Sequence, residues 1–167
     1  MIPETLYNCS LSVDGRGYAG RAPSMTPPKL KIKTDDYRAG GMDATIKVDQ
    51  GMEALDAAFA MASLEYDVLK FFGLLDGNAF NGVFRAAFKD RSGKVKAAAV
   101  YVRGILHEVD PGEWKPGEKG EMKYSVGCDY YKMEIDGAVV HEIDILACKR
   151  IINGVDQLAE VRKALGM

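Results

Sequence analysis

The segment Gly15–Gly20, GRGYAG, matches the G-x-G-x-x-G spacing of dinucleotide-binding loops. In such loops a helix begins at the last glycine, and its N-terminal amides receive the pyrophosphate. Here Pro23, Pro27 and Pro28 follow instead and forbid that helix. No βαβ pattern surrounds the segment. We therefore interpret it as a hairpin turn, not as a cofactor site.

The other chemically reactive side chains are isolated along the chain. His107 and His141 are the only histidines, and neither has metal-ligand spacing to another histidine or to a cysteine. The cysteines Cys9, Cys128 and Cys148 are odd in number and widely spaced, which favours free thiols in a reducing compartment over disulfides. No G-x-S-x-G, C-x-x-C or H-E-x-x-H motif occurs. We predict no catalytic, cofactor-binding or metal-binding residue, and no enzyme.

Composition is typical of a globular protein. The chain has 167 residues, 47% hydrophobic and 28% charged, which predicts a single domain over residues 1–167. A net charge of −2 argues against a dedicated, sequence-specific nucleic-acid binder. The N-terminus lacks the pattern of a secretory signal, and the longest apolar run, Ala97–Val102, is too short to span a bilayer. We therefore expect synthesis in the cytoplasm and no membrane segment.

Most of the chain has the alternating pattern of β-strands. A β-rich run ends at Asp110, a loop rich in proline and glycine follows, and a second run covers 122–135. Asp136-Gly137 then predicts a tight hairpin turn into a third run from Ala138, because both residues tolerate positive φ. Earlier strands are predicted over 6–13, 29–33, 45–48, 80–88 and 95–105. The sum predicts a mainly β (α+β) sandwich or barrel with one or two helices.

Two regions favour helices. Gly51–Phe72 suits one amphipathic helix by propensity, but it also suits a strand followed by a short helix capped by Ser63 and ended by Gly73. Periodicity alone favours the single helix. Near the end, Asn153 is a predicted cap for a helix over 155–165 with an apolar stripe, closed by Gly166.

Aromatic residues suggest contacts beyond the chain. Trp114 lies in a charged loop flanked by proline and glycine, where it could anchor an interface or fold back onto its own core. Tyr130 and Tyr131 point to opposite strand faces, so both faces are expected to meet something bulky. This weakly favours assembly.

Three separated blocks of the sequence are distinctive: PPKLKIKTDDYRAGGMDATIKVDQGMEAL, VRGILHEVDPGEWKPGEKGEMKYSVGCDYYKMEIDG and INGVDQLAEVRKALG. Together they resemble the major tail tube proteins of contractile-tailed bacteriophages, and they are especially similar to the tubes of R-type pyocins, which are contractile bacteriocins. The blocks occur in family order, and the likeness covers essentially the whole chain.

The resemblance implies a β-sandwich or barrel-like tail tube fold with a short mid-chain helix and a C-terminal helix. It changes the expectation for the ambiguous region to a strand over 53–62 and a helix from about 65 to 72. It also implies hexameric rings that stack into a hollow tube for DNA or tape-measure passage and envelope penetration. Further expected partners are the tail sheath protein, a baseplate or tube initiator, and a tape-measure protein in the lumen. The expected mature location is the tail tube of a virion or a bacteriocin particle.

We expect the segment Tyr37–Gly51 to reach an adjacent ring, with Gly40-Gly41 as its pivot. The candidate contacts between subunits are Tyr37, Arg38, Gly40, Gly41, Met42 and Trp114. Candidate lumen residues are Asp43, Asp49 and Asp129. Two alternatives remain: a tube protein of a related injection or secretion system, and a soluble ligand-binding β-sandwich.

Overall fold

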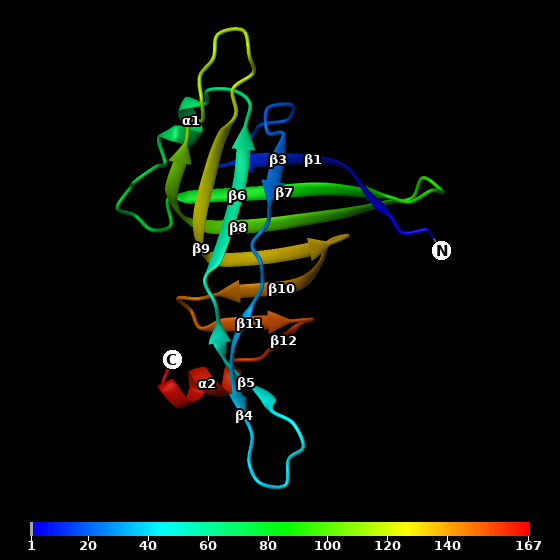
Figure 1. Cartoon of the computed structure of the whole chain (residues 1–167), viewed down its shortest axis with the longest axis vertical. Coiled ribbons are helices and arrows are strands. Elements are labelled where there is room, and N and C mark those ends of the chain that lie inside the picture. The colour runs from blue at the N-terminus through cyan, green and yellow to red at the C-terminus, as the bar shows by residue number, and fades with distance from the viewer. Residues whose placement is uncertain (1) are drawn as a thin grey trace.

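The computed structural model describes residues 2–167, which form a mainly β structure with two short helices (Figure 1). The elements are β1 (Thr5–Val13), β2 (Arg16–Gly17), β3 (Ser24–Thr26), β4 (Ile32–Tyr37), β5 (Ile46–Met52), β6 (Leu55–Met61), α1 (Tyr66–Leu69), β7 (Phe80–Lys89), β8 (Val95–Asp110), β9 (Met122–Ile135), β10 (Ala138–Asp144), β11 (Lys149–Ile152), β12 (Val155–Asp156) and α2 (Ala159–Leu165).

The strands form two layers, and two long antiparallel strands, β8 and β9, contribute to both of them. The second half of β9 pairs with β10, and the sheet continues from there through β11 to β12. The first half of β9 pairs instead with β6 through seven residue pairs from Leu55–Cys128 to Met61–Met122, and β3 pairs with β6. β8 pairs with β7 on its other side, and β1 and β2 follow. The strands of the β3–β6 layer therefore cross those of the larger layer at a steep angle (Figure 1).

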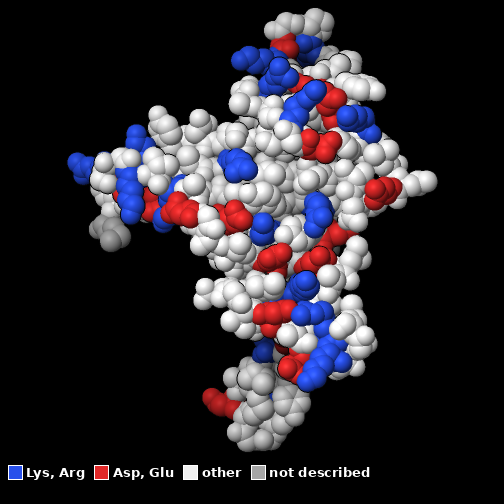
Figure 2. Space-filling model, turned by 180° about the vertical axis from the view of Figure 1, so that it is seen from behind, with Lys and Arg blue, Asp and Glu red and all other residues white. Residues whose placement is uncertain are grey.

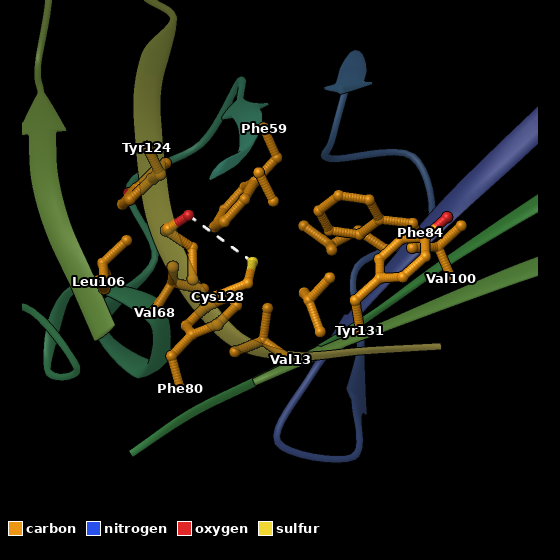
Figure 3. Close-up of a cluster of buried hydrophobic side chains, with 14 of the residues drawn as sticks. Val13, Phe59, Val68, Phe80, Phe84, Val100, Leu106, Tyr124, Cys128 and Tyr131 are labelled. Atoms are coloured by element: carbon orange, nitrogen blue, oxygen red, sulfur yellow. Dashed lines mark hydrogen bonds between the residues drawn. The ribbon is translucent and has the colours of Figure 1, made fainter. Parts of the chain in front are cut away.

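Apolar side chains fill the space between these layers. Phe59 of β6 stacks on Tyr124 of β9 with 4.8 Å between ring centroids, and on Phe80 of β7 at 5.7 Å. Phe84 meets Phe59 edge-on at 6.3 Å. Figure 3 shows these rings together with Val13, Val68 and Leu106. Successive side chains of a strand point to opposite faces of the sheet, so every second residue of these strands faces the core.

The predicted hairpin around Asp136-Gly137 is confirmed. β9 covers 122–135 as predicted, and both turn residues have positive φ, 50° and 83°. The Asp136 carboxylate also accepts a hydrogen bond from the Ala97 backbone N–H at 2.9 Å, which ties the turn to β8. The strands predicted over 6–13, 80–88 and 95–105 are present as β1, β7 and β8. The predicted fold, a β-sandwich or barrel-like structure with a mid-chain and a C-terminal helix, is likewise confirmed.

The ambiguous region is a strand followed by a short helix, so the single helix favoured by periodicity is wrong. β6 is buried between layers, and α1 has one turn with Val68 in the core. Ser63 does not cap it; its hydroxyl donates to the Glu65 carboxylate at 2.5 Å. The helix ends at Leu69, before Gly73, because Phe72 bridges to Leu106 of β8 and draws the chain onto the sheet.

The predicted extent of the C-terminal helix is wrong. Asn153 and Gly154 both have positive φ, 51° and 78°, and form a hairpin turn between β11 and β12. The helix α2 begins only at Ala159. Asn-Gly is among the strongest hairpin signals, and here it prevails over the capping role predicted for Asn153. Gly166 ends the helix in the left-handed conformation, φ 74°, as predicted.

Gly104 permits the close approach of β8 and β9, which lie side by side as antiparallel neighbours. Their register shifts between Arg103 and Gly104, and a Cβ at Gly104 would lie 1.9 Å from the carbonyl oxygen of Gly127. A Cβ at Gly127 would meet nothing closer than 3.5 Å. Only the first glycine is therefore required for the approach of the two backbones.

We predict that Gly104→Ala lowers the free energy of unfolding by about 3 kcal/mol, because the backbones of β8 and β9 must separate at this point. The matched Gly127→Ala should change it by less than about 1 kcal/mol. Urea unfolding followed by circular dichroism measures both. Equal effects of the two variants would contradict this account of the close approach at Gly104.

Candidate assembly surfaces

A two-stranded arm formed by β4 and β5 projects from the body of the molecule (Figure 1). The two strands pair only with each other, from Ile32–Met52 to Tyr37–Ile46, and belong to neither layer of the main sheet. Every residue of β4 is exposed, and in β5 only Met52 is partly buried. An isolated two-stranded hairpin is marginally stable in water, so this arm is a strong candidate for contact with another chain.

The two faces of the arm differ in chemistry. Tyr37 pairs with Ile46, and Val48 lies two residues farther along the same face, where all three side chains are exposed. The opposite face carries Asp36 and Lys47, whose charged groups lie 3.5 Å apart. Asp35, the register partner of Val48, lies on the first face beside these apolar side chains. The arm therefore exposes three large apolar side chains on one face and a charged pair on the other.

Five of the six predicted contact residues lie together at the tip of the arm. The Arg38 guanidinium donates a hydrogen bond to the Met42 backbone carbonyl at 3.3 Å, and the Met42 backbone N–H donates one to the Ala39 backbone carbonyl at 3.2 Å. Gly41 has φ 85° within this turn, so the glycine pair closes the tip. It cannot act as the pivot that we expected, because it lies at the end of the arm far from the body. The chain instead enters the arm before Ile32 and returns to the body after Met52.

The sixth predicted residue, Trp114, lies at the opposite end of the long axis, in the loop between β8 and β9 (Figure 1). Its side chain is 72% exposed, and its indole N–H donates to the Pro111 carbonyl of the same loop at 3.1 Å. Trp114 therefore does not fold onto the core. An exposed indole held in one orientation is typical of an interface anchor.

Further exposed apolar residues were missed by the sequence analysis. One group follows β6 around α1: Leu64, Tyr66, Phe72, Leu74 and Leu75. A second group lies on or near α2: Ile145, Leu146, Val155, Val161 and Leu165. The predicted stripe of the C-terminal helix is thus largely exposed, and α2 has no buried residue. Periodicity identified apolar faces but gave no sign that the body leaves them uncovered.

The three candidate lumen residues do not form a group. Asp43 is exposed in the arm, and Asp49, near the arm's root, pairs with Arg150 of β11 at 2.7 Å. Asp129 is half-buried on β9, where its carbonyl accepts a bond from Ile145 at 3.0 Å. Acidic and basic side chains alternate along the face in Figure 2, without one dominant sign.

Tyr130 and Tyr131 point to opposite faces of β9, as predicted. Tyr131 is buried in the core, whereas the Tyr130 hydroxyl donates to Glu142 at 3.0 Å and its ring lies 4.3 Å from the Arg103 guanidinium. Both partners of Tyr130 come from its own chain. This pair therefore gives no evidence of another subunit.

The residues considered for chemistry are dispersed. Gly15 lies in the turn between β1 and β2, followed by no helix, so a hairpin turn is confirmed for this motif. His107 is exposed on β8, and His141 lies on β10 with its Nδ1 buried and without a hydrogen-bond partner. Within residues 2–167 no three histidine, cysteine or acidic side chains are grouped to hold a metal ion. In that same span neither helix could cross a membrane.

Comparison with known protein families gives a match over residues 3–166 to the family described as phage tail tube protein FII. The chain is 32% identical over 170 residues to the tail tube protein of Escherichia phage P2, with 99% of each chain covered. It is 35% identical over 147 residues to the major tail tube protein of Serratia phage KSP20, covering 87% of this chain and 85% of the relative.

The fold is similar to that of a solved assembly component. The sheath/tube terminator of an extracellular contractile injection system, PVC, in its extended state aligns with a TM-score of 0.62 at 10% identity. The alignment covers 80% of this chain and 98% of the other. At that identity the likeness concerns the fold.

Thiol reactivity offers a test of the core around Cys128. Burial raises the pKa of the Cys128 thiol to about 12, and the thiol donates to the Val126 carbonyl at 3.7 Å (Figure 3). At pH 8 roughly one molecule in ten thousand then carries the reactive thiolate. We predict that a chromogenic disulfide reagent modifies Cys128 only after unfolding, whereas the partly exposed Cys9 and Cys148 react in the folded protein. Fast modification of Cys128 at pH 8 would contradict its place in the core.

Proposed function

The chain belongs to the phage tail tube protein FII family, and we propose how its surfaces join copies of it into a tube. It is a structural tube subunit of a contractile, phage-tail type injection system. In our proposal six copies close into a ring and the rings stack into a hollow conduit. A ring closed by strand pairing removes exposed sheet edges, which a lone subunit would leave open.

The arm is the observation that carries this proposal. It extends along the long axis of the molecule, away from the end that bears Trp114 (Figure 1). A contact between two different ends of identical chains is heterologous, and repeating it produces a filament. We infer that the apolar face with Tyr37 and Ile46 packs onto a subunit of the next ring. Burial of that face supplies the cover that the arm lacks within its own chain.

The remaining partners follow from the role of a tube. We propose that the sheath protein surrounds the tube, that a baseplate initiator starts its growth, and that DNA or a tape-measure protein passes through it. The subunit is made in the bacterial cytoplasm and ends in the tail of a virion or in a bacteriocin particle. A net charge of −2 suits a conduit for DNA, because each phosphate neutralised by lysine or arginine would add affinity and slow transit.

We predict that Tyr37→Ser combined with Arg38→Ser yields folded subunits that no longer polymerise. Tyr37 is 54% exposed, so its loss should leave the unfolding midpoint almost unchanged. Tube length in negative-stain micrographs, after co-expression with an initiator, measures the effect. The matched control, Asp36→Asn with Lys47→Gln, alters the opposite face and should still form tubes. Tubes of normal length from the Tyr37 variant would refute the role of the arm.

Trp114 is the sole tryptophan and reports directly on its own loop. If the loop contacts a neighbouring subunit, assembly removes the exposed indole from water, and its emission should shift to shorter wavelength as tubes form. The non-polymerising arm variant serves as the control and should keep the emission of the free subunit. Emission that stays constant during tube growth would exclude Trp114 from the contact.

A further inference from the structure

Few interactions hold the root of the arm against the body. The Glu53 backbone N–H donates to the carbonyl of Lys31 at 2.9 Å, and their side chains form a loose, exposed pair at 3.7 Å. Both of these contacts join the two strands of the arm to each other. The polar side-chain contact that joins the arm to the main sheet is the pair of Asp49 and Arg150, at 2.7 Å.

Apolar packing at the root is incomplete. A cleft of about 500 Å³ lies between the arm and β10–β11, lined by Leu30, Ile32 and Ile152 among others. A second, of about 520 Å³, lies on the other side against β6 and β9. Met52 lines both clefts. Because van der Waals attraction falls steeply with distance, an arm flanked by open clefts is weakly held by packing.

Asp49 binds in two directions. One carboxylate oxygen accepts a bond from the Arg150 guanidinium, and the other accepts the Gly51 backbone N–H at 2.8 Å. Gly51 has φ 96°, so it provides the bend by which the chain leaves the arm. The Gly51 amide, and then Arg150, lower the pKa of this carboxyl, which therefore stays ionised at neutral pH. One side chain thus contacts both the bend at Gly51 and the main sheet.

Arg150 is suited to hold the arm because it is itself well anchored. It pairs with Ile143 of β10 in the register of the sheet, and its side chain is only 14% exposed. The Asp49 side chain is 44% exposed. An arginine stem packed on a sheet with its charged end in a cleft has less conformational freedom than a surface side chain.

We propose that Asp49 and Arg150 are positioning residues that fix the angle of the arm before it meets another subunit. This inference rests on the proposed role of the arm in joining copies. An arm that is already oriented loses less conformational freedom on binding, so the contact forms faster and more tightly. Because Asp49 is well exposed to solvent and the pair joins only the arm to the body, its loss should change the orientation of the arm and leave the fold of the body intact.

Spin labels can measure the orientation. In a Cys9→Ser, Cys148→Ser background, labels at Ala39→Cys in the arm and Ala138→Cys at the start of β10 report the distance between arm tip and sheet. We expect a narrow distribution of the distance between the labels in the protein that keeps both Asp49 and Arg150. The distribution should be broad in Arg150→Met and of intermediate width in Arg150→Lys. The matched control, Lys96→Met, breaks the remote Glu4–Lys96 pair of 2.6 Å and should keep the narrow distribution.

Tube growth provides the second measurement. Arg150→Met should slow elongation by about tenfold at an unchanged unfolding midpoint, and Arg150→Lys should restore part of the rate. An unchanged distance distribution in Arg150→Met, or growth at the parent rate, would overturn the positioning role. If the parent chain forms no tube under any condition, the proposed function fails, and the distance measurement still decides whether the pair orients the arm.

Discussion

The pairing of β8 with β9 is the interaction on which the rest of the structure depends. These strands are the longest in the chain, and β6, β7 and β10 all pair with one or the other. They can serve two layers because their backbones pass very close at Gly104, where no side chain fits. The aromatic cluster around Phe59 and Tyr124 fills the space between the two layers that share these strands. The core, the two layers and the loop bearing Trp114 are therefore all built on this strand pair.

The second constraint is the apolar surface that the fold leaves uncovered. Tyr37, Ile46 and Val48 on the arm have no partner within the chain, and the groups near α1 and α2 are similarly exposed. Scattered exposed apolar residues are ordinary, but three large ones side by side on a projecting hairpin are not. Membership of a tail tube family supports our proposal that this surface packs on a neighbouring subunit.

The arm also shows how a weakly packed root can still be directed. Clefts on both sides of Met52 leave little apolar contact, and the Asp49–Arg150 pair supplies direction without rigid packing. Because the arm shares little packing with the core, we expect substitutions in the arm to leave the body folded, and in our proposal such substitutions alter assembly.

The sequence by itself determined the local features. Alternation set the bounds of β9, Asp136-Gly137 set its turn, and the chemistry of Gly166 set the end of the last helix, because each depends on neighbouring residues alone. The resemblance of three sequence blocks led to the tube family and corrected the strand at 53–62. Tertiary structure decided the rest. Contacts between residues far apart in the chain decide whether Asn153 caps a helix or turns a hairpin. They also decide where α1 ends and which apolar faces remain exposed. The Asp49–Arg150 pair joins residues 101 positions apart, so local spacing in the sequence gives no sign of it.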